Sequence, residues 1–426
     1  MCIISHIDHL RKYYPTERRE NQDIVALSIG ISKYPKLRFP GFDDPWEIYT
    51  AEDLFQNVAD KNHADETVLT IVQGKGTLPR EQSGRNIHYD NSSLTNYKMV
   101  QKGDFIIHLR SFEGGLEMAN GNGIVSPAYT ILRCSKPHSS RFYEAYFHTD
   151  EFINHVLSKT VEGIRDGRQI SYNAFKWLGI PYCAPKEQEK IAKLFTILSK
   201  RIEKQQQLVD AVTKYRRGLL RTIFLEKPAL LPIETADNLK IEEVCDVLSG
   251  KRIPKGETFS SQPTEYRYIT VSDMGEKYVR SDTLQYITSH TEKQISRYKV
   301  KDGDIIISVA GTLGKLNIIT SDLEGVNLTE NCDRFTNFRR INPEYLYYVL
   351  SSDLIQVQIK ASKTKNGQPK LALERIRNFT IPVPERSTQE KLVCVMNAID
   401  RQIAFHKAIN EKYYAMRAGL LQQLFI

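Results

Sequence analysis

An internal repeat is the feature that most constrains how this chain folds. The segment "QEKIAKLFTILSKRI" from Gln188 is matched by "QEKLVCVMNAIDRQI" from Gln389, 201 positions later. The match has no gaps over 45 positions and extends to "RRGLLRTIF" in the first copy and "RAGLLQQLF" in the second. Upstream, "YKMVQKGDFII" is matched by "YKVKDGDIII". Because a repeat of this extent means that one structural plan is used twice, we predict two equivalent halves.

The repeated regions are predicted to form two long helices, from about Lys186 to Phe224 and from about Ser387 to Phe425. Both follow a proline-containing lead-in, lack internal proline and place apolar residues at alternating spacings of four and three, as a coiled coil does. At 1.5 Å per residue, each helix is roughly 58 Å long. We expect the helices to pack on each other, with a close contact at their equivalent glycines. The residues assigned to helix packing or partner docking are Ile191, Leu198, Ile202, Gly218, Leu392, Ile399, Ile403 and Gly419.

The regions between the helices differ from each other and are rich in Tyr, Thr, Val and Ile in short runs punctuated by Gly and Asn. Such runs are typical of strands, and each region also carries one helical segment, so we predict two mixed α/β domains. The fold class is therefore α+β, with a twofold internal repeat. The predicted division is an unassigned N-terminal extension at 1–34, a first variable domain at 35–180, a helix at 181–228, a second variable domain at 229–380 and a helix at 381–426.

Composition excludes several classes of protein. No stretch of about 18 apolar residues exists to cross a membrane, and the N-terminal "MCIISHIDHLRKYYP" does not resemble a secretory signal, so we expect a cytoplasmic protein. The six cysteines lie far apart without CxxC spacing, which favours free thiols over disulfides or a zinc site. A formal charge of +8 permits a polyanionic partner without requiring one.

Signatures of catalysis are weak. "AGTLGKL" fails as a phosphate loop because Val309 stands where the first glycine is required and Leu316 replaces Ser or Thr. "NPEY" departs from the NPPY tetrapeptide of amino-methyltransferases at Glu344, and a proline in the first turn of a helix explains it better. His6 and His9 share the spacing of one helix face, but no other ligands complete a metal site. We therefore predict no catalytic residues and no metal site.

Loops suited to nucleic-acid binding occur in both variable domains. "QGKGTLPREQSGRN", "VEGIRDGRQIS", "SGKRIPKGE" and "SKTKNGQPK" concentrate Arg, Lys, Asn and Gln beside glycine. Lys and Arg neutralise phosphates, whereas Arg, Asn and Gln also discriminate base edges. A single loop of this kind is more often an ordinary solvated surface. However, "RDGRQIS" and "TKNGQPKLA" occupy matching places just before the two lead-ins.

Taken in this order, the motifs resemble the specificity subunits of type I restriction-modification systems. The similarity covers nearly everything beyond the first 34 residues: "PKLRFPGF", a variable domain, "GIP" with "P.EQEKIA", a long helix, and the same plan again. "GDFIIHLRSFEGG" with "GIVSPAYTILR" is typical of one class of target-recognition domain, and "GDIIISVAGTLGK" of another. The unexplained N-terminus and the partial identity of the two helices depart from the pattern.

This resemblance implies a non-catalytic DNA-binding subunit. It implies antiparallel helices with a pseudo-twofold axis that dock two methyltransferase subunits, and two target-recognition domains that each read one half of a bipartite, asymmetric double-stranded DNA target. No cofactor is expected in this chain: S-adenosylmethionine, ATP and Mg²⁺ would act on partner subunits, which can include two restriction subunits. The candidate DNA contacts are Lys75, Arg80, Arg85, Arg110, Arg165, Arg168, Gln169, Lys251, Arg252, Lys315, Lys363, Lys365, Asn366 and Gln368.

Two other functions remain open on sequence alone. A coiled-coil scaffold or architectural protein would bind any duplex with similar affinity. An unrecognised DNA methyltransferase or nuclease would modify or cut DNA when purified alone with S-adenosylmethionine or magnesium.

Overall fold

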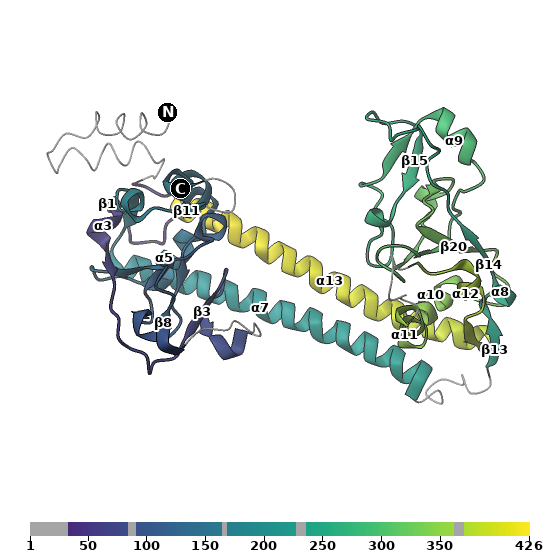
Figure 1. Cartoon of the computed structure of the whole chain (residues 1–426), viewed down its shortest axis with the longest axis horizontal. Coiled ribbons are helices and arrows are strands. Elements are labelled where there is room, and N and C mark those ends of the chain that lie inside the picture. The colour runs from purple at the N-terminus through teal and green to yellow at the C-terminus, as the bar shows by residue number, and fades with distance from the viewer. Residues whose placement is uncertain (1–32, 84–90, 164–167, 227–235, 362–369) are drawn as a thin grey trace. The chain divides into compact units, whose positions relative to one another are not determined.

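The described part of the chain forms two units built on one plan (Figure 1). We call them unit 1, Met1–Gln205 with Ile409–Ile426, and unit 2, Gln206–Ala408. The long helices α7 (Pro185–Arg221) and α13 (Arg386–Phe425) each contribute residues to both units. The computed structural model describes residues 33–83, 91–163, 168–226, 236–361 and 370–426.

The predicted linear division therefore differs from the observed one. The sequence predicts each long helix as a segment separate from the variable domains, but each unit takes the first part of one long helix and the last part of the other. The reason is packing, because apolar residues of both helices are buried in the core of each unit. Most of the predicted N-terminal extension, including His6 and His9, lies outside the described residues.

Unit 1 is built around a four-stranded antiparallel sheet of order β2-β9-β6-β7. Strand β1 pairs separately with β12, directly before the long helix α7. The helices α5 and η3 follow β9 along the chain. The elements are β1 (Glu47–Thr50), α3 (Ala51–Leu54), β2 (Phe55–Val58), β3 (Leu69–Val72), β4 (Gly76–Pro79), η1 (Arg80–Ser83), η2 (Asn91–Asn96), β5 (Lys98–Val100), β6 (Phe105–Ile107), α4 (Ser111–Gly114), β7 (Glu117–Met118), β8 (Gly123–Val125), β9 (Thr130–Cys134), α5 (Ser140–Phe147), η3 (Glu151–Val156), η4 (Leu157–Thr160), β10 (Val161–Glu162), β11 (Gln169–Ile170), α6 (Tyr172–Phe175) and β12 (Gly179–Tyr182).

Unit 2 repeats this plan. Its main sheet has the order β14-β20-β17-β18, also antiparallel, and β13 pairs with β21 directly before α13. A second sheet has the order β16-β15-β19; the described residues of unit 1 have the pairs β3-β4 and β5-β8, with a parallel bridge between Val68 and Ile124. The elements are η6 (Thr222–Glu226), β13 (Asp237–Lys240), α8 (Ile241–Val244), β14 (Asp246–Ser249), β15 (Tyr266–Ile269), η8 (Val271–Asp273), β16 (Gln285–Ile287), α9 (Ser289–Ile295), β17 (Ile305–Ser308), β18 (Leu316–Ile318), η9 (Ser321–Leu323), β19 (Asn327–Leu328), β20 (Cys332–Thr336), α10 (Pro343–Ser351), α11 (Asp353–Lys360), α12 (Leu373–Arg377) and β21 (Thr380–Val383).

The repeated Gly-Asp turn has the same structure in both units. In unit 1, the carboxylate of Asp104 accepts the backbone N–H of Gln101 at 2.8 Å and is held by Arg133 at 2.7 Å. In unit 2, Asp304 accepts the N–H of Lys301 at 2.9 Å, and Arg334 lies 3.3 Å away. Each aspartate therefore caps the turn that precedes a buried central strand, which explains why the sequence repeats the pair.

The glutamine of the repeated "QEK" motif also has a structural role. Gln188 is fully buried: its Oε1 accepts the backbone N–H of Ser139 at 2.9 Å, and its Nε2 donates to the carbonyl of Cys183 at 2.8 Å. Gln389, also fully buried, accepts the N–H of Asn342 at 2.7 Å. In each unit this amide joins the start of the long helix to the start of the helix after the sheet, α5 or α10, and satisfies a backbone group that burial would otherwise leave unpaired.

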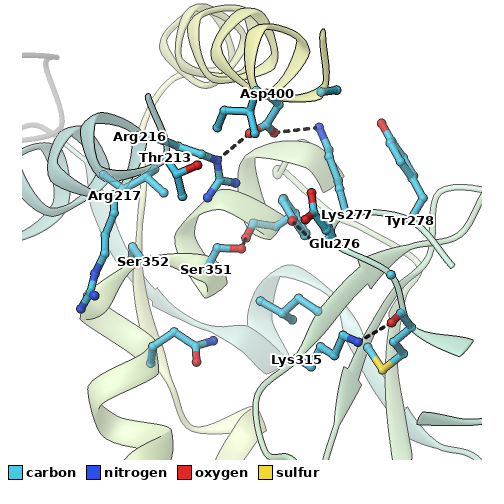
Figure 2. Close-up of a pocket in the computed structure, with 18 of the residues that line it drawn as sticks. Thr213, Arg216, Arg217, Glu276, Lys277, Tyr278, Lys315, Ser351, Ser352 and Asp400 are labelled. Carbon is cyan, nitrogen blue, oxygen red and sulfur yellow. Dashed lines mark hydrogen bonds and ion pairs between the residues drawn. The ribbon is translucent and has the colours of Figure 1, made fainter. Parts of the chain in front are cut away.

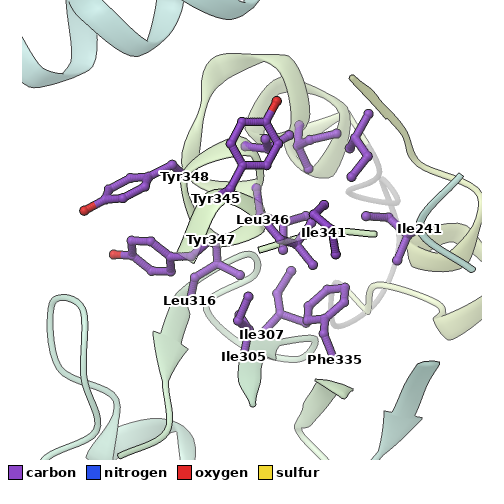
Figure 3. Packing of buried hydrophobic residues seen from close by; sticks show 14 of the residues in the cluster. Ile241, Ile305, Ile307, Leu316, Phe335, Ile341, Tyr345, Leu346, Tyr347 and Tyr348 are labelled. Carbon is purple, nitrogen blue, oxygen red and sulfur yellow. The ribbon is translucent and has the colours of Figure 1, made fainter. Parts of the chain in front are cut away.

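The core of unit 2 lies between α10 and the main sheet (Figure 3). Tyr345 and Leu346 of α10 pack in one cluster with Ile305 and Ile307 of β17 and Phe335 of β20, all with 0% exposure. The proline of "NPEY" occupies the first turn of α10, as predicted, with the Asn side chain accepting the first free N–H groups. This helix is therefore a core element of the unit.

Within unit 1, the two long helices run antiparallel where they meet. The ring of Phe195 on α7 stacks on Phe425 of α13, with centroids 6.3 Å apart, whereas Arg201 donates to the hydroxyl of Tyr413 at 3.1 Å. Residue numbers rise on one helix as they fall on the other. The apolar residues that the sequence assigned to packing are all buried: Ile191, Leu198, Ile202, Leu392, Ile399 and Ile403.

The predicted close helix contact at the two glycines is wrong. Gly218 and Gly419 are exposed, and a Cβ at either position would meet no atom within 4 Å beyond its own helix backbone. The neighbouring Leu220 and Leu421 are buried instead. The glycines therefore lie on outward faces of the helices, where they cost helix stability without permitting a closer approach.

Other predictions from composition concern thiols and membranes. The five described cysteines are free: Cys134, Cys183, Cys245, Cys332 and Cys394. No helix in the described ranges has the length and apolarity needed to cross a membrane.

"AGTLGKL" leads into strand β18 and not into a helix, so it lacks the helix N-terminus that a phosphate loop provides.

Candidate nucleic-acid interface

A rigid turn presents Gln73 and Lys75 at the surface of unit 1. This turn joins β3 to β4, and a buried carboxylate holds it: Glu117, 1% exposed, accepts the backbone N–H groups of Gly74 at 2.6 Å and Gly76 at 2.9 Å. His148 lies 3.5 Å from the same carboxylate. The exposed side chains of the turn are therefore carried on a fixed backbone.

The Glu117–His148 pair shifts the titration of both groups. Burial opposes ionisation of Glu117, but the hydrogen bonds from His148, Gly74 and Gly76 prevail and lower its pKa. Burial likewise opposes the charged form of His148, whereas its hydrogen bond to Glu117 prevails and raises the pKa of the imidazole. The charged pair is thus favoured in the folded unit.

Helix α4 lies beside this turn, and strand β11 lies beside α4. The guanidinium carbon of Arg168 lies 4.6 Å from the centroid of the Phe112 ring. Arg110, exposed, directly precedes α4. The amide of Gln73 occupies the position where a Cβ on Gly114 would stand, only 2.0 Å away. The structure thus brings together side chains that are up to 95 positions apart in the sequence.

We call this group the unit 1 edge: Gln73, Lys75, Arg110, Phe112 and Arg168. It combines three cations, an amide and an aromatic ring, which are the side chains that contact phosphates, base edges and base faces. Of the sequence-predicted residues, Lys75, Arg110 and Arg168 belong to it, and Gln169 follows in β11. Arg80 begins η1 and is half-buried. Arg85 and Arg165 lie outside the described residues.

Gln73 and Phe112 were not among the DNA contacts predicted from the sequence. The signal for Gln73 was its place beside two glycines in "QGKG", which is typical of a tight turn that displays its side chains. Phe112 carried no such signal, because an isolated phenylalanine is usually a core residue. Only its contact with Arg168 distinguishes it.

In unit 2, the predicted residues Lys251 and Arg252 are exposed in the loop after β14. The Nε of Arg252 donates to Glu330 at 2.6 Å. The ammonium of Lys251 lies 5.8 Å from the ring centroid of Tyr298, and its backbone carbonyl accepts the hydroxyl of Tyr268 at 2.6 Å. This loop is held at its base while both cations face solvent.

Lys315 is placed differently from what the sequence suggested. Its ammonium donates to the backbone carbonyl of Met274, and the side chain is half-buried. An interior hydrogen bond thus takes up one of its donors. The other predicted contacts of this domain, Lys363, Lys365, Asn366 and Gln368, lie outside the described residues.

Lys315 lines a groove of about 1470 Å³, which we call the unit 2 groove (Figure 2). Asp400 of α13 lines it and accepts hydrogen bonds from Arg216 of α7 at 2.5 Å and from the hydroxyl of Tyr348 at 2.6 Å. The ammonium of Lys277 lies 3.7 Å from the same carboxylate. These contacts join both long helices, α10 and the segment after η8 within one unit.

Among the described residues, no group of three or more His, Cys, Asp or Glu side chains is placed to hold a metal ion.

Comparison with known proteins identifies a related domain. Residues 233–412 match the family model of the type I restriction modification DNA specificity domain. A stretch of 126 residues, 29% of this chain, is 27% identical to the specificity subunit of the type I restriction enzyme EcoBI from Escherichia coli. That match spans 26% of the length of the Escherichia coli protein.

Two solved structures share the fold. The S subunit of the type I restriction-modification system from M. genitalium aligns with a TM-score of 0.54 and 17% identity, over 92% of this chain and 99% of that one. A chain from a study of complex assembly and conformational transition in the type I R-M system aligns with a TM-score of 0.56 and 16% identity, over 91% and 99%. Residues 233–412 therefore resemble the type I restriction modification DNA specificity domain, and the resemblance of the chain to type I specificity subunits is confirmed.

Proposed function

We propose that this chain is the sequence-specific DNA-binding subunit of a type I restriction-modification complex. Each unit contributes one recognition domain, which reads one half of a bipartite, asymmetric double-stranded target. In this proposal the chain has no active site. S-adenosylmethionine would act on methyltransferase partners, and ATP and Mg²⁺ on restriction subunits where these are present.

The observation that carries the proposal is one scaffold with two different surfaces. The sheet orders β2-β9-β6-β7 and β14-β20-β17-β18 are equivalent, and the capped Gly-Asp turns are the same. The loop after the central strand differs: in unit 1 it carries Arg110 and Phe112, whereas in unit 2 it carries Lys315, turned inward. Equal scaffolds with unequal loops are what reading two different half-sites requires, because base contacts specify sequence.

Docking of two methyltransferase subunits is supported by exposed apolar side chains at equivalent places on the helices. In unit 1, a shallow groove of about 360 Å³ is lined by Leu194, Ile197, Met416 and Leu420, and Ile197 and Met416 are 58% and 52% exposed. An offset of 201 places the second set in unit 2: Leu219, Ala398, Tyr215 and Val395, the last two 62% and 51% exposed. Exposed apolar patches of this kind mark protein interfaces.

The test is to map methylated adenines in a host genome with and without this gene, alongside the gene of its methyltransferase partner. We expect a two-part asymmetric motif that disappears with the gene. An unchanged methylome, with both proteins expressed, would contradict the proposal and favour a scaffold that binds DNA without sequence preference.

A further inference from the structure

The unit 2 groove carries an excess of positive charge. Eight cationic side chains and three carboxylates line it among the described residues. The carboxylates are already paired: Asp400 with Arg216, Asp353 with Arg217 at 3.2 Å, and Glu276 with Lys407. A ligand of this groove is therefore expected to be an anion. The eight cations are Arg216, Arg217, Lys277, Arg280, Lys315, Lys360, Arg401 and Lys407.

Two of these cations are available for such a ligand. Lys360, at the end of α11, and Arg401, on α13, are exposed, and neither forms an ion pair with a carboxylate of the described residues. They come from different elements that meet at the groove. Their charges are therefore not neutralised by the protein itself.

We propose that the unit 2 groove binds phosphates of the nucleic-acid backbone, and so holds the duplex without reading its sequence. The inference rests on the proposed function. Uncharged donors of the groove are already used: the hydroxyls of Thr213 and Ser351 donate to backbone carbonyls, as does the amide of Gln356. The donors left for phosphate oxygens are therefore those of the cations.

An acidic protein segment fits the groove less well. Protein interfaces are anchored by apolar or aromatic side chains that insert into pockets. Three apolar residues of the groove, Leu220, Leu316 and Ile403, are 2%, 6% and 8% exposed and belong to the core of the unit. Tyr278 also lines the groove and is 45% exposed. The excess of cations over carboxylates nevertheless favours a ligand with many negative charges, such as a phosphate backbone.

The test compares two double variants of the full chain that remove the same charge. Lys360→Gln with Arg401→Gln neutralises the groove, whereas Lys293→Gln with Lys391→Gln neutralises two exposed lysines of unit 2 outside it. Binding to a fluorescent duplex of mixed sequence is measured over a series of salt concentrations. Each phosphate contact contributes about 0.9 to the slope of log K against log salt, so the groove variant is expected to lower the slope by about 2. The control is expected to change it much less.

Equal slopes for the two double variants would overturn the proposal. If the groove variant keeps the slope but no longer binds the purified methyltransferase subunit, the groove belongs to a protein partner and the proposal is also wrong. The charge-retaining pair Lys360→Arg with Arg401→Lys is expected to keep the wild-type slope, which separates loss of charge from loss of folding.

The outcome is distinguishable from failure of the proposed function. A groove variant that retains the methylated motif but has an unchanged slope contradicts only the groove. A wild-type chain that supports no methylated motif contradicts the proposed function, whatever the slope.

Discussion

The guanidinium of Arg168 lies 4.6 Å from the centre of the Phe112 ring, although 56 positions separate the two residues. Arg168 directly precedes β11 and Phe112 belongs to α4. The guanidinium and the ring form a cation–π contact, which restrains the side chain of Arg168. The contact thus orders one exposed arginine at the unit 1 edge.

We predict that Arg168→Ala lowers the salt slope of DNA binding by about 1, as expected when a single phosphate contact is lost. If Arg168 reads a base instead, the salt slope of DNA binding stays unchanged and the first half of the methylated motif becomes less specific. Lys186→Ala, which removes an exposed charge from the first turn of α7, is the control. Unchanged affinity and motif in Arg168→Ala would remove this residue from the interface.

Phe112→Leu separates stacking from charge. Leucine keeps the apolar packing but lacks an aromatic face, and an exposed cation–π contact contributes about 0.5–1 kcal/mol. We expect affinity for the methylated target sequence to fall about two- to fivefold with the salt slope unchanged, as measured by fluorescence anisotropy. A variant with wild-type affinity would show that the ring does not position Arg168.

The Glu117–His148 pair predicts a pH dependence of unit 1 stability. The folded pKa of Glu117 is lowered, so its contribution is present above the ordinary value of 4.5 and is lost as the pH falls through the folded pKa. The folded pKa of His148 is raised, so its contribution is complete below 6.5 and is lost as the pH rises through the folded pKa. We expect the pair to stabilise the unit most between pH 4.5 and 6.5.

The measurement is urea unfolding of wild type and His148→Gln on both sides of pH 6.5. Both tryptophans of the chain, Trp46 and Trp177, belong to unit 1, so their fluorescence reports this unit. The difference in unfolding free energy between the two proteins is expected to shrink as the pH rises. A constant difference would show that folding does not shift the pKa of His148.

The buried glutamines predict unit-specific destabilisation. Gln188→Ala leaves the N–H of Ser139 without its acceptor, at a cost of about 1–3 kcal/mol. We expect the urea midpoint of unfolding, followed by tryptophan fluorescence, to fall in Gln188→Ala. The same midpoint is expected to stay unchanged in Gln389→Ala, because Gln389 belongs to unit 2. Exposed Gln402→Ala on α13 is the control. Equal loss in both variants would mean that the units unfold as one.

The two apolar patches predict a stoichiometry. Met416→Asp and Tyr215→Asp occupy equivalent positions on exposed helix faces. We expect each single variant to bind one methyltransferase subunit in place of two and the double variant to bind none, as measured by light scattering, because a buried unpaired charge opposes docking. Val357→Asp, equally exposed on α11, is the control. Two bound subunits in the double variant would exclude these patches as the docking sites.

Exchange of residues 35–180 for the corresponding domain of another specificity subunit tests modular reading. We expect one half of the methylated motif to change and the other to remain, because base contacts are local to each unit. Methylome sequencing of the chimera is the measurement. A change in both halves would contradict independent recognition domains.

The sequence by itself determined the repeated plan, because its signals are local. The long helices begin at Pro185 and Arg386, within one residue of their predicted starts, since a proline-bounded apolar periodicity marks a helix wherever it packs. The position of the Pro of "NPEY" was predicted for the same reason: a few neighbouring residues fix the backbone there.

The tertiary structure decided which side chains of those elements are exposed and which residues they contact. Gly218 and Gly419 were predicted to allow close helix contact, yet they face outward, because which helix face is buried depends on the packing of a whole unit. Lys315 turned inward to the carbonyl of Met274, and Phe112 met Arg168 across 56 positions. Contacts between residues distant in the chain depend on how strands and loops pack in space, and local propensity carries no information about them.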